Sequence, residues 1–242
     1  MKRFFTALSF LTTIPSPYHD PAGMEELAKS AAWFPWVGAL IGALVALIYI
    51  GLTKFFPEFV SAVVSVGVWV YLTGGLHLDG LADSFDGLLN SSTPERRLEI
   101  MKDPRLGAFG ALGLIWMMIF KISILTALPV KLAWLAIPLA ASTARWVLIY
   151  AGRQPMARPD GLGAAFKPHL GWVGMFMAAI LPLGLAVLCG WRGFAAFVLG
   201  CVCAAGIMLW ARIRLGGLTG DVFGLIVETV EAVVLLIFVV HF

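Results

Sequence analysis

The chain has 242 residues, of which 60% are hydrophobic and only 13% are charged, and its mean hydropathy is +0.93. This composition excludes a soluble globular domain and is typical of a protein with several membrane spans. The formal net charge is only +3, and we expect no nucleic-acid partner.

Apolar runs long enough to cross a bilayer recur along the whole chain. A span needs about 20 mainly apolar residues, and about seven such runs occur. Each span must satisfy its own backbone hydrogen bonds in lipid, and the runs lack the short alternation of a barrel. We therefore predict an all-α fold, a polytopic integral membrane helical bundle forming one catalytic domain over residues 1–242. The expected spans are 32–53, 58–78, 107–128, 132–150, 171–190, 194–211 and 221–240.

The N-terminal segment MKRFFTALSFLTTIPSP resembles a signal peptide at first sight, with basic residues followed by an apolar run. The run is short, ends at Pro15 and Pro17, and has no small-x-small cleavage site. We expect an interfacial helix there.

Basic residues are distributed unequally between the two sides that seven spans would define. The segments 1–31, 79–106, 145–170 and 212–221 fall on one side and hold 13 of the 17 Lys and Arg residues. By the positive-inside rule that side is cytoplasmic. Every stretch dense in polar residues falls on the same side, which predicts a single site facing the cytoplasm from the inner membrane.

The stretch 73–110 concentrates charge in an otherwise apolar chain, with six of the 14 acidic residues. Asp79, Asp83 and Asp86 are spaced i, i+4 and i+7, so on a helix they lie within about 60° of one another on one face. Three carboxylates on one stripe repel, and a divalent cation would relieve that repulsion. A solvated loop face and a purely structural cation are the alternatives.

An internal echo of this stretch occurs near the C-terminus. GGLHLD at 74–79 is matched by GGLTGD at 216–221, and each copy has an acid seven residues later, Asp86 in the first and Glu228 in the second. If the echo is more than coincidence, two acidic helices face one another. We then expect Asp221 and Glu228, from the motif at 214–231, to join Asp79, Asp83 and Asp86 as metal ligands. Glu231 lies farther round the helix and is the weaker candidate.

Oxygen ligands without a Cys or His cage favour Mg²⁺, or Mn²⁺, over zinc. Mg²⁺ commonly binds a few carboxylates together with substrate phosphates, so a diphosphate substrate would fit this set. Asp83 or Asp86 could instead accept a proton as the general base, since spacing alone does not separate a ligand from a base.

Basic residues beside the acidic stretch suggest phosphate contacts. Lys102 and Arg105 are candidate catalytic groups, and Asp103 between them is a candidate substrate contact. Arg145, near a span end, and Lys167 are further substrate-binding candidates on the same side. Neutralising anionic lipid or fixing topology is the alternative for these basic residues.

His77 stands two residues before Asp79 and could position a substrate or take a proton. A hydrogen bond at a helix end is the plainer role for such a histidine. We keep it as a substrate-binding candidate.

Three motifs in order, GGLHLDGLADSFDGLL, RRLEIMKDPRLGAFGALGL and GGLTGDVFGLIVETVEA, resemble the signatures of the cobalamin synthase, or adenosylcobinamide-GDP ribazoletransferase, family. The resemblance extends over essentially the whole chain. It implies transfer of adenosylcobinamide phosphate from its GDP-activated form to α-ribazole or its 5′-phosphate, with release of GMP and dependence on Mg²⁺. The implied partners are the corrinoid nucleotide, α-ribazole and the lipid bilayer, and the sequence allows a homo-oligomer.

Other functions fit the pattern less well. Ubiquinone-type prenyltransferases expect two N/D-D-x-x-D-like motifs, whereas the second copy here has one Asp and two Glu. CDP-alcohol phosphotransferases expect D-G-x-x-A-R, whereas the corresponding stretch here, DGLAD at 79–83, has Asp83 in place of the Arg. A transporter expects polar residues at mid-membrane on several spans, and only Lys121, Glu228 and Glu231 lie deep enough.

Overall fold

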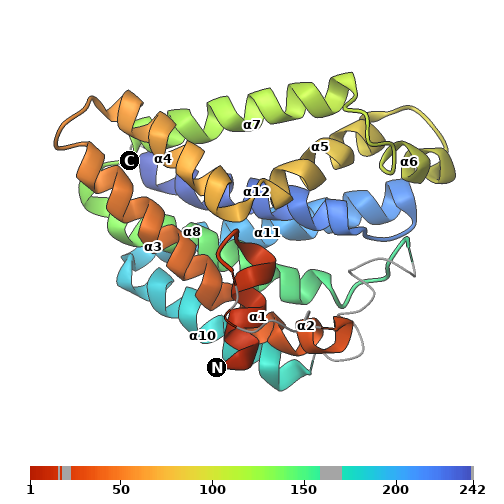
Figure 1. Ribbon diagram of the computed structural model, residues 1–242, viewed down its shortest axis with the longest axis horizontal. Coiled ribbons are helices and arrows are strands. Elements are labelled where there is room, and N and C mark those ends of the chain that lie inside the picture. The colour runs from red at the N-terminus through yellow and green to blue at the C-terminus, as the bar shows by residue number, and fades with distance from the viewer. Residues whose placement is uncertain (16, 18–22, 159–170, 241–242) are drawn as a thin grey trace.

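The computed structural model describes residues 1–15, 17, 23–158 and 171–240. Helices make up nearly all of this part of the chain, as the sequence predicts (Figure 1). Their bounds are α1 Lys2–Leu11, α2 Met24–Ser30, η1 Ala31–Trp33, α3 Phe34–Leu52, α4 Glu58–Thr73, α5 Leu76–Leu89, α6 Pro94–Ile100, α7 Ala108–Ala127, α8 Val130–Ala151, α10 Trp172–Leu188, α11 Gly190–Leu215 and α12 Gly220–Val239.

Five stretches are long and apolar enough to cross a membrane: 25–52 with α3, and helices α7, α8, α11 and α12. The bent pair of α4 and α5 would make a sixth span, and α10 is a shorter apolar helix of 17 residues. About seven spans is therefore roughly consistent with the structure. Large apolar side chains lie exposed along the outer helices, for example Ile119 on α7, Val187 on α10 and Val202 on α11. A bilayer would cover them.

The second expected span, 58–78, is shorter than predicted. Helix α4 ends at Thr73, and α5 leaves it at an angle of 91°. Gly74 and Gly75 form the corner with φ values of +62° and +70°, a left-handed conformation that glycine adopts without the steric cost of a Cβ. The corner points α5, and the carboxylates on it, away from the axis of α4.

Helix α12 lies at the centre of the bundle, where it packs against α5, α8 and α11 (Figure 1). Helices α3 and α8 pack most extensively, and a Cβ on Gly38 or Gly42 would collide with the α8 backbone near Ala141 and Pro138. Small residues at such crossings allow two helical backbones to approach closely.

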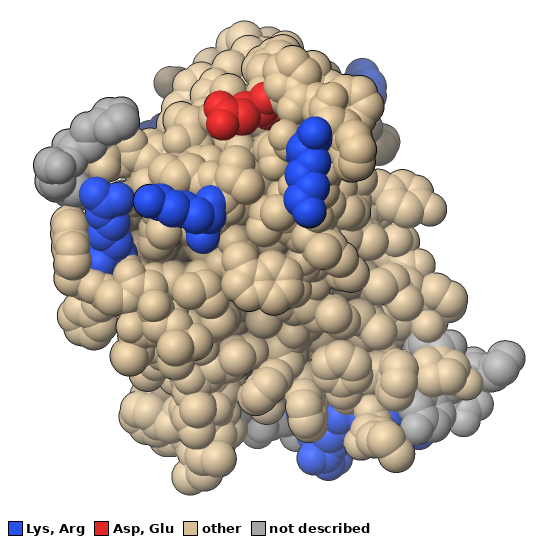
Figure 2. Space-filling view, turned by 90° about the vertical axis from the view of Figure 1, so that its left-hand side faces the viewer, with Lys and Arg blue, Asp and Glu red and all other residues tan. Residues whose placement is uncertain are grey.

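The bundle has two chemically different ends. We call the end that carries α5, α6, residues 152–158 and the loop 216–219 the site end. The turns joining α3 to α4 and α7 to α8 lie at the opposite end, on the left of Figure 1. Figure 2 shows that opposite end, where most of the surface is uncharged and only a few Lys and Arg side chains and a small acidic patch stand out. The polar stretches thus converge on one end, as the alternation of spans predicts.

Candidate functional site

Two acidic helices cross at the site end, and glycines form their contact. A Cβ added to Gly80 of α5 would lie 2.8 Å from the Asp221 carbonyl oxygen, and one added to Gly224 of α12 would lie 2.6 Å from the His77 carbonyl oxygen. Only glycines permit this approach. The crossing confirms the prediction that the two copies of the echo face one another.

The crossing gathers the first carboxylates of the two copies. Asp79 is exposed on α5, while Asp83 and, on α12, Asp221 are half-buried. The negative charges of Asp221, Asp79 and Asp86 all act on the Asp83 carboxylate, against the positive charge of Arg158. We call Asp79, Asp83 and Asp221 the open acidic cluster.

Arg158 is a residue of this site that the sequence analysis missed. Its Nη1 donates to Asp221 Oδ2 at 3.0 Å, and its Nη2 donates to the Leu98 carbonyl oxygen at 3.0 Å. Arg158 therefore links α12 to α6. One guanidinium beside three carboxylates leaves the open acidic cluster with excess negative charge.

A short backbone pairing positions Arg158. Leu218 N donates to the Pro155 carbonyl oxygen at 2.9 Å, and Ala157 N donates to the Leu218 carbonyl oxygen at 2.8 Å. A Cβ on Gly217 would lie 2.5 Å from Ala157 N, so this loop also needs glycine. Neither the helix spacing nor the charge pattern of the sequence signals the pairing.

Asp86 has other partners than the open acidic cluster. Its two carboxylate oxygens accept hydrogen bonds from the backbone N–H groups of Gly107 and Gly110, each at 2.8 Å. These groups open α7, so Asp86 caps that helix, where a negative charge is stabilising. With both oxygens bound, Asp86 is a poor candidate for the metal-ligand and general-base roles expected from its spacing.

Glu228 lies in a second group of charges inside the bundle. Lys121 Nζ donates to Glu228 Oε2 and to Glu231 Oε2, both at 2.5 Å, and the Arg145 guanidinium donates to Glu231 Oε1. All four residues are at most 5% exposed. We call Lys121, Arg145, Glu228 and Glu231 the buried ion-pair network.

The buried ion-pair network changes two expectations. Arg145 is fully buried in α8 and contacts Glu231, so it is not the substrate contact near a span end that the sequence suggested. Glu228 is committed to Lys121 rather than grouped with Asp221. Equal numbers of positive and negative groups make this network self-neutralising, which weakens the transporter alternative.

A polar cavity of about 430 Å³ lies beside the open acidic cluster. Its lining includes Asp79 and Asp83 from α5, and Lys102, Asp103 and Arg105 from the α6–α7 connection. The expected neighbourhood of these five residues is confirmed. Arg105 Nη2 donates to Asp103 Oδ2 at 2.6 Å, and this partner lowers the pKa of Asp103 to about 2.

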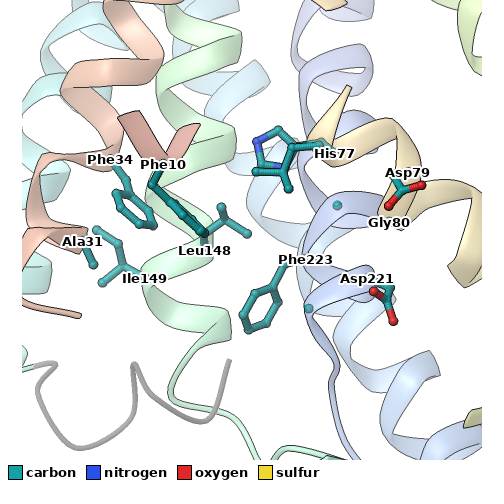
Figure 3. A pocket seen from close by; sticks show the side chains of 13 residues that line it. Phe10, Ala31, Phe34, His77, Asp79, Gly80, Leu148, Ile149, Asp221 and Phe223 are labelled. Atoms are coloured by element: carbon teal, nitrogen blue, oxygen red, sulfur yellow. The ribbon is translucent and has the colours of Figure 1, made fainter. Parts of the chain in front are cut away.

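An apolar cavity of about 250 Å³ lies against Asp79 and Asp221 on another side (Figure 3). Its walls come from α1, α3, α5, α8 and α12, and include Phe10, Leu148 and Phe223. His77 also lines it, with 4% of its surface exposed. His77 Nε2 has no hydrogen-bond partner among the described residues, so the plain helix-end hydrogen bond is not what holds this nitrogen.

Comparison with known proteins identifies the family of this chain. The family model described as cobalamin-5-phosphate synthase matches residues 3–239. The chain belongs to the cobalamin-5-phosphate synthase family. Three relatives are named adenosylcobinamide-GDP ribazoletransferase: those of Desulfitobacterium hafniense (37% identical; 98% of this chain and 96% of the relative), Chlorobaculum tepidum (40%; 96% and 92%) and Escherichia coli K12 (36%; 97% and 98%). No solved structure matches.

In this member of the cobalamin-5-phosphate synthase family, the carboxylates meet only part of the requirement for a metal site. No three His, Cys, Asp or Glu side chains in the described ranges are arranged so that they could hold an ion by themselves. The open acidic cluster nevertheless offers hard oxygen donors with excess negative charge. Mg²⁺ usually takes one or two carboxylates and completes its shell with water and substrate phosphates, so a closed protein cage is not required.

Lys167, a predicted substrate contact, lies outside the residues that the structure of this family member describes. The remaining predicted site residues divide into two groups. Asp79, Asp83, Asp221, His77, Lys102, Asp103 and Arg105 line the two cavities at the site end. Asp86, Glu228 and Arg145 are bound to partners elsewhere.

Proposed function

We propose that this membrane protein joins adenosylcobinamide-GDP to α-ribazole, or to its 5′-phosphate, at the site end, in a Mg²⁺-dependent reaction that releases GMP. The family and the names of its relatives support the activity. The observation that carries the choice of site is the crossing of α5 and α12. It brings Asp79, Asp83 and Asp221 together beside a cavity with two basic side chains.

Asp79 of α5 and Asp221 of α12 are the residues that would hold the metal, together with water and the donor's phosphate oxygens. With three carboxylates opposed by one guanidinium, the cluster attracts a cation and repels a free diphosphate. When bound, Mg²⁺ or Mn²⁺ would offset the charge of the donor's diphosphate oxygens and of the departing GMP. Arg158 now pairs with Asp221 and would have to share that carboxylate with the ion.

Lys102 and Arg105 would bind diphosphate oxygens in the polar cavity. Arg105 is held by Asp103, which orients its planar guanidinium through two contacts, from Nε at 2.9 Å and from Nη2 at 2.6 Å. A guanidinium in a fixed orientation suits an oxygen pair. Asp103 is then a positioning residue for Arg105 rather than a direct contact with the anionic donor.

The transfer needs one proton acceptor. A ribose hydroxyl oxygen of the acceptor attacks the phosphorus next to cobinamide and forms the new P–O bond. The bond from that phosphorus to the bridging oxygen breaks, and GMP leaves with that oxygen. We assign Asp83 to take the hydroxyl proton, because Asp86 is engaged by two backbone N–H groups and Asp83 lines the cavity.

We propose further that the site end faces the cytoplasm from the inner membrane. The side assigned to it by counting spans holds 13 of the 17 basic residues, and the opposite end is poor in charge (Figure 2). Both substrates would then reach the site from the cytoplasm. A homo-oligomer stays a prediction.

Purified protein in lipid nanodiscs tests the function directly. Given adenosylcobinamide-GDP and α-ribazole, it should release GMP only when Mg²⁺ or Mn²⁺ is present, and a chelator should stop the release reversibly. Release that continues unchanged in excess chelator would refute the metal. No release under any condition would refute the reaction.

A further inference from the structure

The apolar cavity at the site end has a lining that suits a flat aromatic group. Phe10 of α1 and Phe34 of α3 form one wall, with ring centroids 5.9 Å apart and planes inclined by only 18°. Phe223 of α12 lies across the space from them, with Leu148 of α8 between (Figure 3). Aromatic rings bind best by offset stacking or edge contacts with such walls.

His77 gives this apolar cavity one polar group. The imidazole lines the cavity, is 4% exposed, and carries an Nε2 without a partner among the described residues. A buried polar atom without a hydrogen bond is destabilising, and a native structure seldom keeps one without a reason. A ligand with a ring nitrogen would supply the missing partner.

Size limits what the cavity can hold. Its volume is about 250 Å³, whereas pockets for drug-sized ligands usually start at about 300 Å³. A corrin macrocycle cannot enter, and no Lys or Arg in the described part of the chain lines the cavity to bind a phosphate group inside it. A single bicyclic base fits.

The two cavities share one residue. Asp79 lines both the apolar cavity and the polar cavity, while Asp221 lines only the first and Asp83 only the second. A ligand bound in one cavity can therefore extend past Asp79 and approach a ligand bound in the other cavity. This is the arrangement that a transfer between two bound substrates requires.

We propose that the apolar cavity is the acceptor subsite and binds the aromatic base of the ribazole, with His77 hydrogen-bonded to a ring nitrogen of that base. The donor's diphosphate then occupies the polar cavity, and the acceptor's ribose extends past Asp79 toward that diphosphate. This assignment rests on the proposed function and adds to it the division of the two substrates between two cavities.

Paired cavity-filling variants separate the two subsites. Leu148→Trp fills the apolar cavity, and Leu114→Trp fills the polar cavity that Leu114 lines. Leu148→Trp should raise KM for α-ribazole by roughly tenfold or more, the loss expected when an aromatic group can no longer be buried, and leave KM for adenosylcobinamide-GDP near the wild-type value. Leu114→Trp should do the reverse. Ile115→Trp, on the exposed face of α7, is the matched control and should change neither.

Because the bulky Leu148→Trp substitution could perturb folding, Phe223→Leu and His77→Ala are tested beside it. Both variants should raise KM for α-ribazole more than they lower kcat. Equilibrium dialysis of α-ribazole against wild-type protein without donor gives a second readout, and Leu148→Trp should abolish that binding. Binding in dialysis would persist even if the transfer assay failed, so the two proposals fail separately.

Two results would overturn the acceptor subsite. One is an unchanged KM for α-ribazole in Leu148→Trp and Phe223→Leu, as expected if the cavity holds a lipid chain. The other is a raised KM for the donor in these variants, which would place the donor there instead.

Discussion

The open acidic cluster and the buried ion-pair network both pair acidic side chains of α12 with basic side chains from other parts of the chain, yet they differ in the ratio of positive to negative groups. The buried network has two cations and two anions in direct contact, all at most 5% exposed. The open cluster has three carboxylates and one guanidinium, and its members are exposed or half-buried. A buried charge must be neutralised within the protein, whereas a charge at a cavity can be neutralised by what binds there.

This difference separates structural charge from functional charge. The sequence shows only that Asp221, Glu228 and Glu231 lie on one helix. The structure shows that the two deeper acids share two buried cations, while Asp221 pairs with Arg158 alone beside two further carboxylates. Breaking the two groups should therefore have different consequences.

The largest expected effect is on activity, from the open acidic cluster. Asp79→Asn or Asp83→Asn should lower turnover by on the order of 100-fold to 10,000-fold, the range for losing a positioned catalytic group, with insertion and stability retained. GMP release per folded molecule is the measurement. Glu58→Gln, an exposed acid at the opposite end, is the matched control. Wild-type turnover in either aspartate variant would refute a catalytic role for the open acidic cluster.

The next largest effect is on stability, from the buried ion-pair network. Glu231→Gln leaves the Arg145 guanidinium buried without its counter-ion, and should lower the free energy of unfolding by about 3–5 kcal/mol. Denaturation in detergent micelles measures it. Lys121→Met with Glu228→Met, which removes a whole pair, should be more stable than Glu228→Met alone. Equal stability of the single and double variants would show that the pairing of Lys121 with Glu228 does not contribute to stability.

The smallest effect concerns Asp86, which the sequence groups with the cluster and the structure assigns to the start of α7. Asp86→Ala should lower stability by about 0.5–2 kcal/mol, as for other lost helix caps, and keep most of the turnover per folded molecule. Thermal unfolding and GMP release, measured on the same preparation, test both parts. A loss of turnover as large as that of Asp83→Asn would show that Asp86 takes part in catalysis.

Much of the fold follows from the sequence because lipid imposes a simple rule. Apolar runs of span length become helices, and their alternation brought residues 73–110, 152–158 and 216–221 to one end. The same reasoning found Asp79, Asp83 and Asp221 as neighbours. The local sequence also explains the start of α6, because Pro94 begins the helix and Thr93 Oγ1 accepts a hydrogen bond from Arg96 N at 3.4 Å.

Three features escaped sequence reasoning for identifiable reasons. The corner at Gly74–Gly75 lies inside a run that is long enough for one span, and length and composition do not show that the run bends there. The partners of Asp86 and Glu228 lie 21 to 107 residues away, and helical spacing carries no information on such distances. Arg158 reaches Asp221 only through the backbone pairing at Leu218, a contact outside any helix.

The central claim is that carboxylates from α5 and from α12 hold one divalent ion together with the donor. Electron paramagnetic resonance of Mn²⁺, titrated into protein with adenosylcobinamide-GDP but without acceptor, tests it most directly. Asp79→Asn on α5 and Asp221→Asn on α12 should each weaken Mn²⁺ binding by roughly tenfold or more, since even supporting residues of metal sites contribute that much. Wild-type Mn²⁺ affinity in both variants would contradict the account.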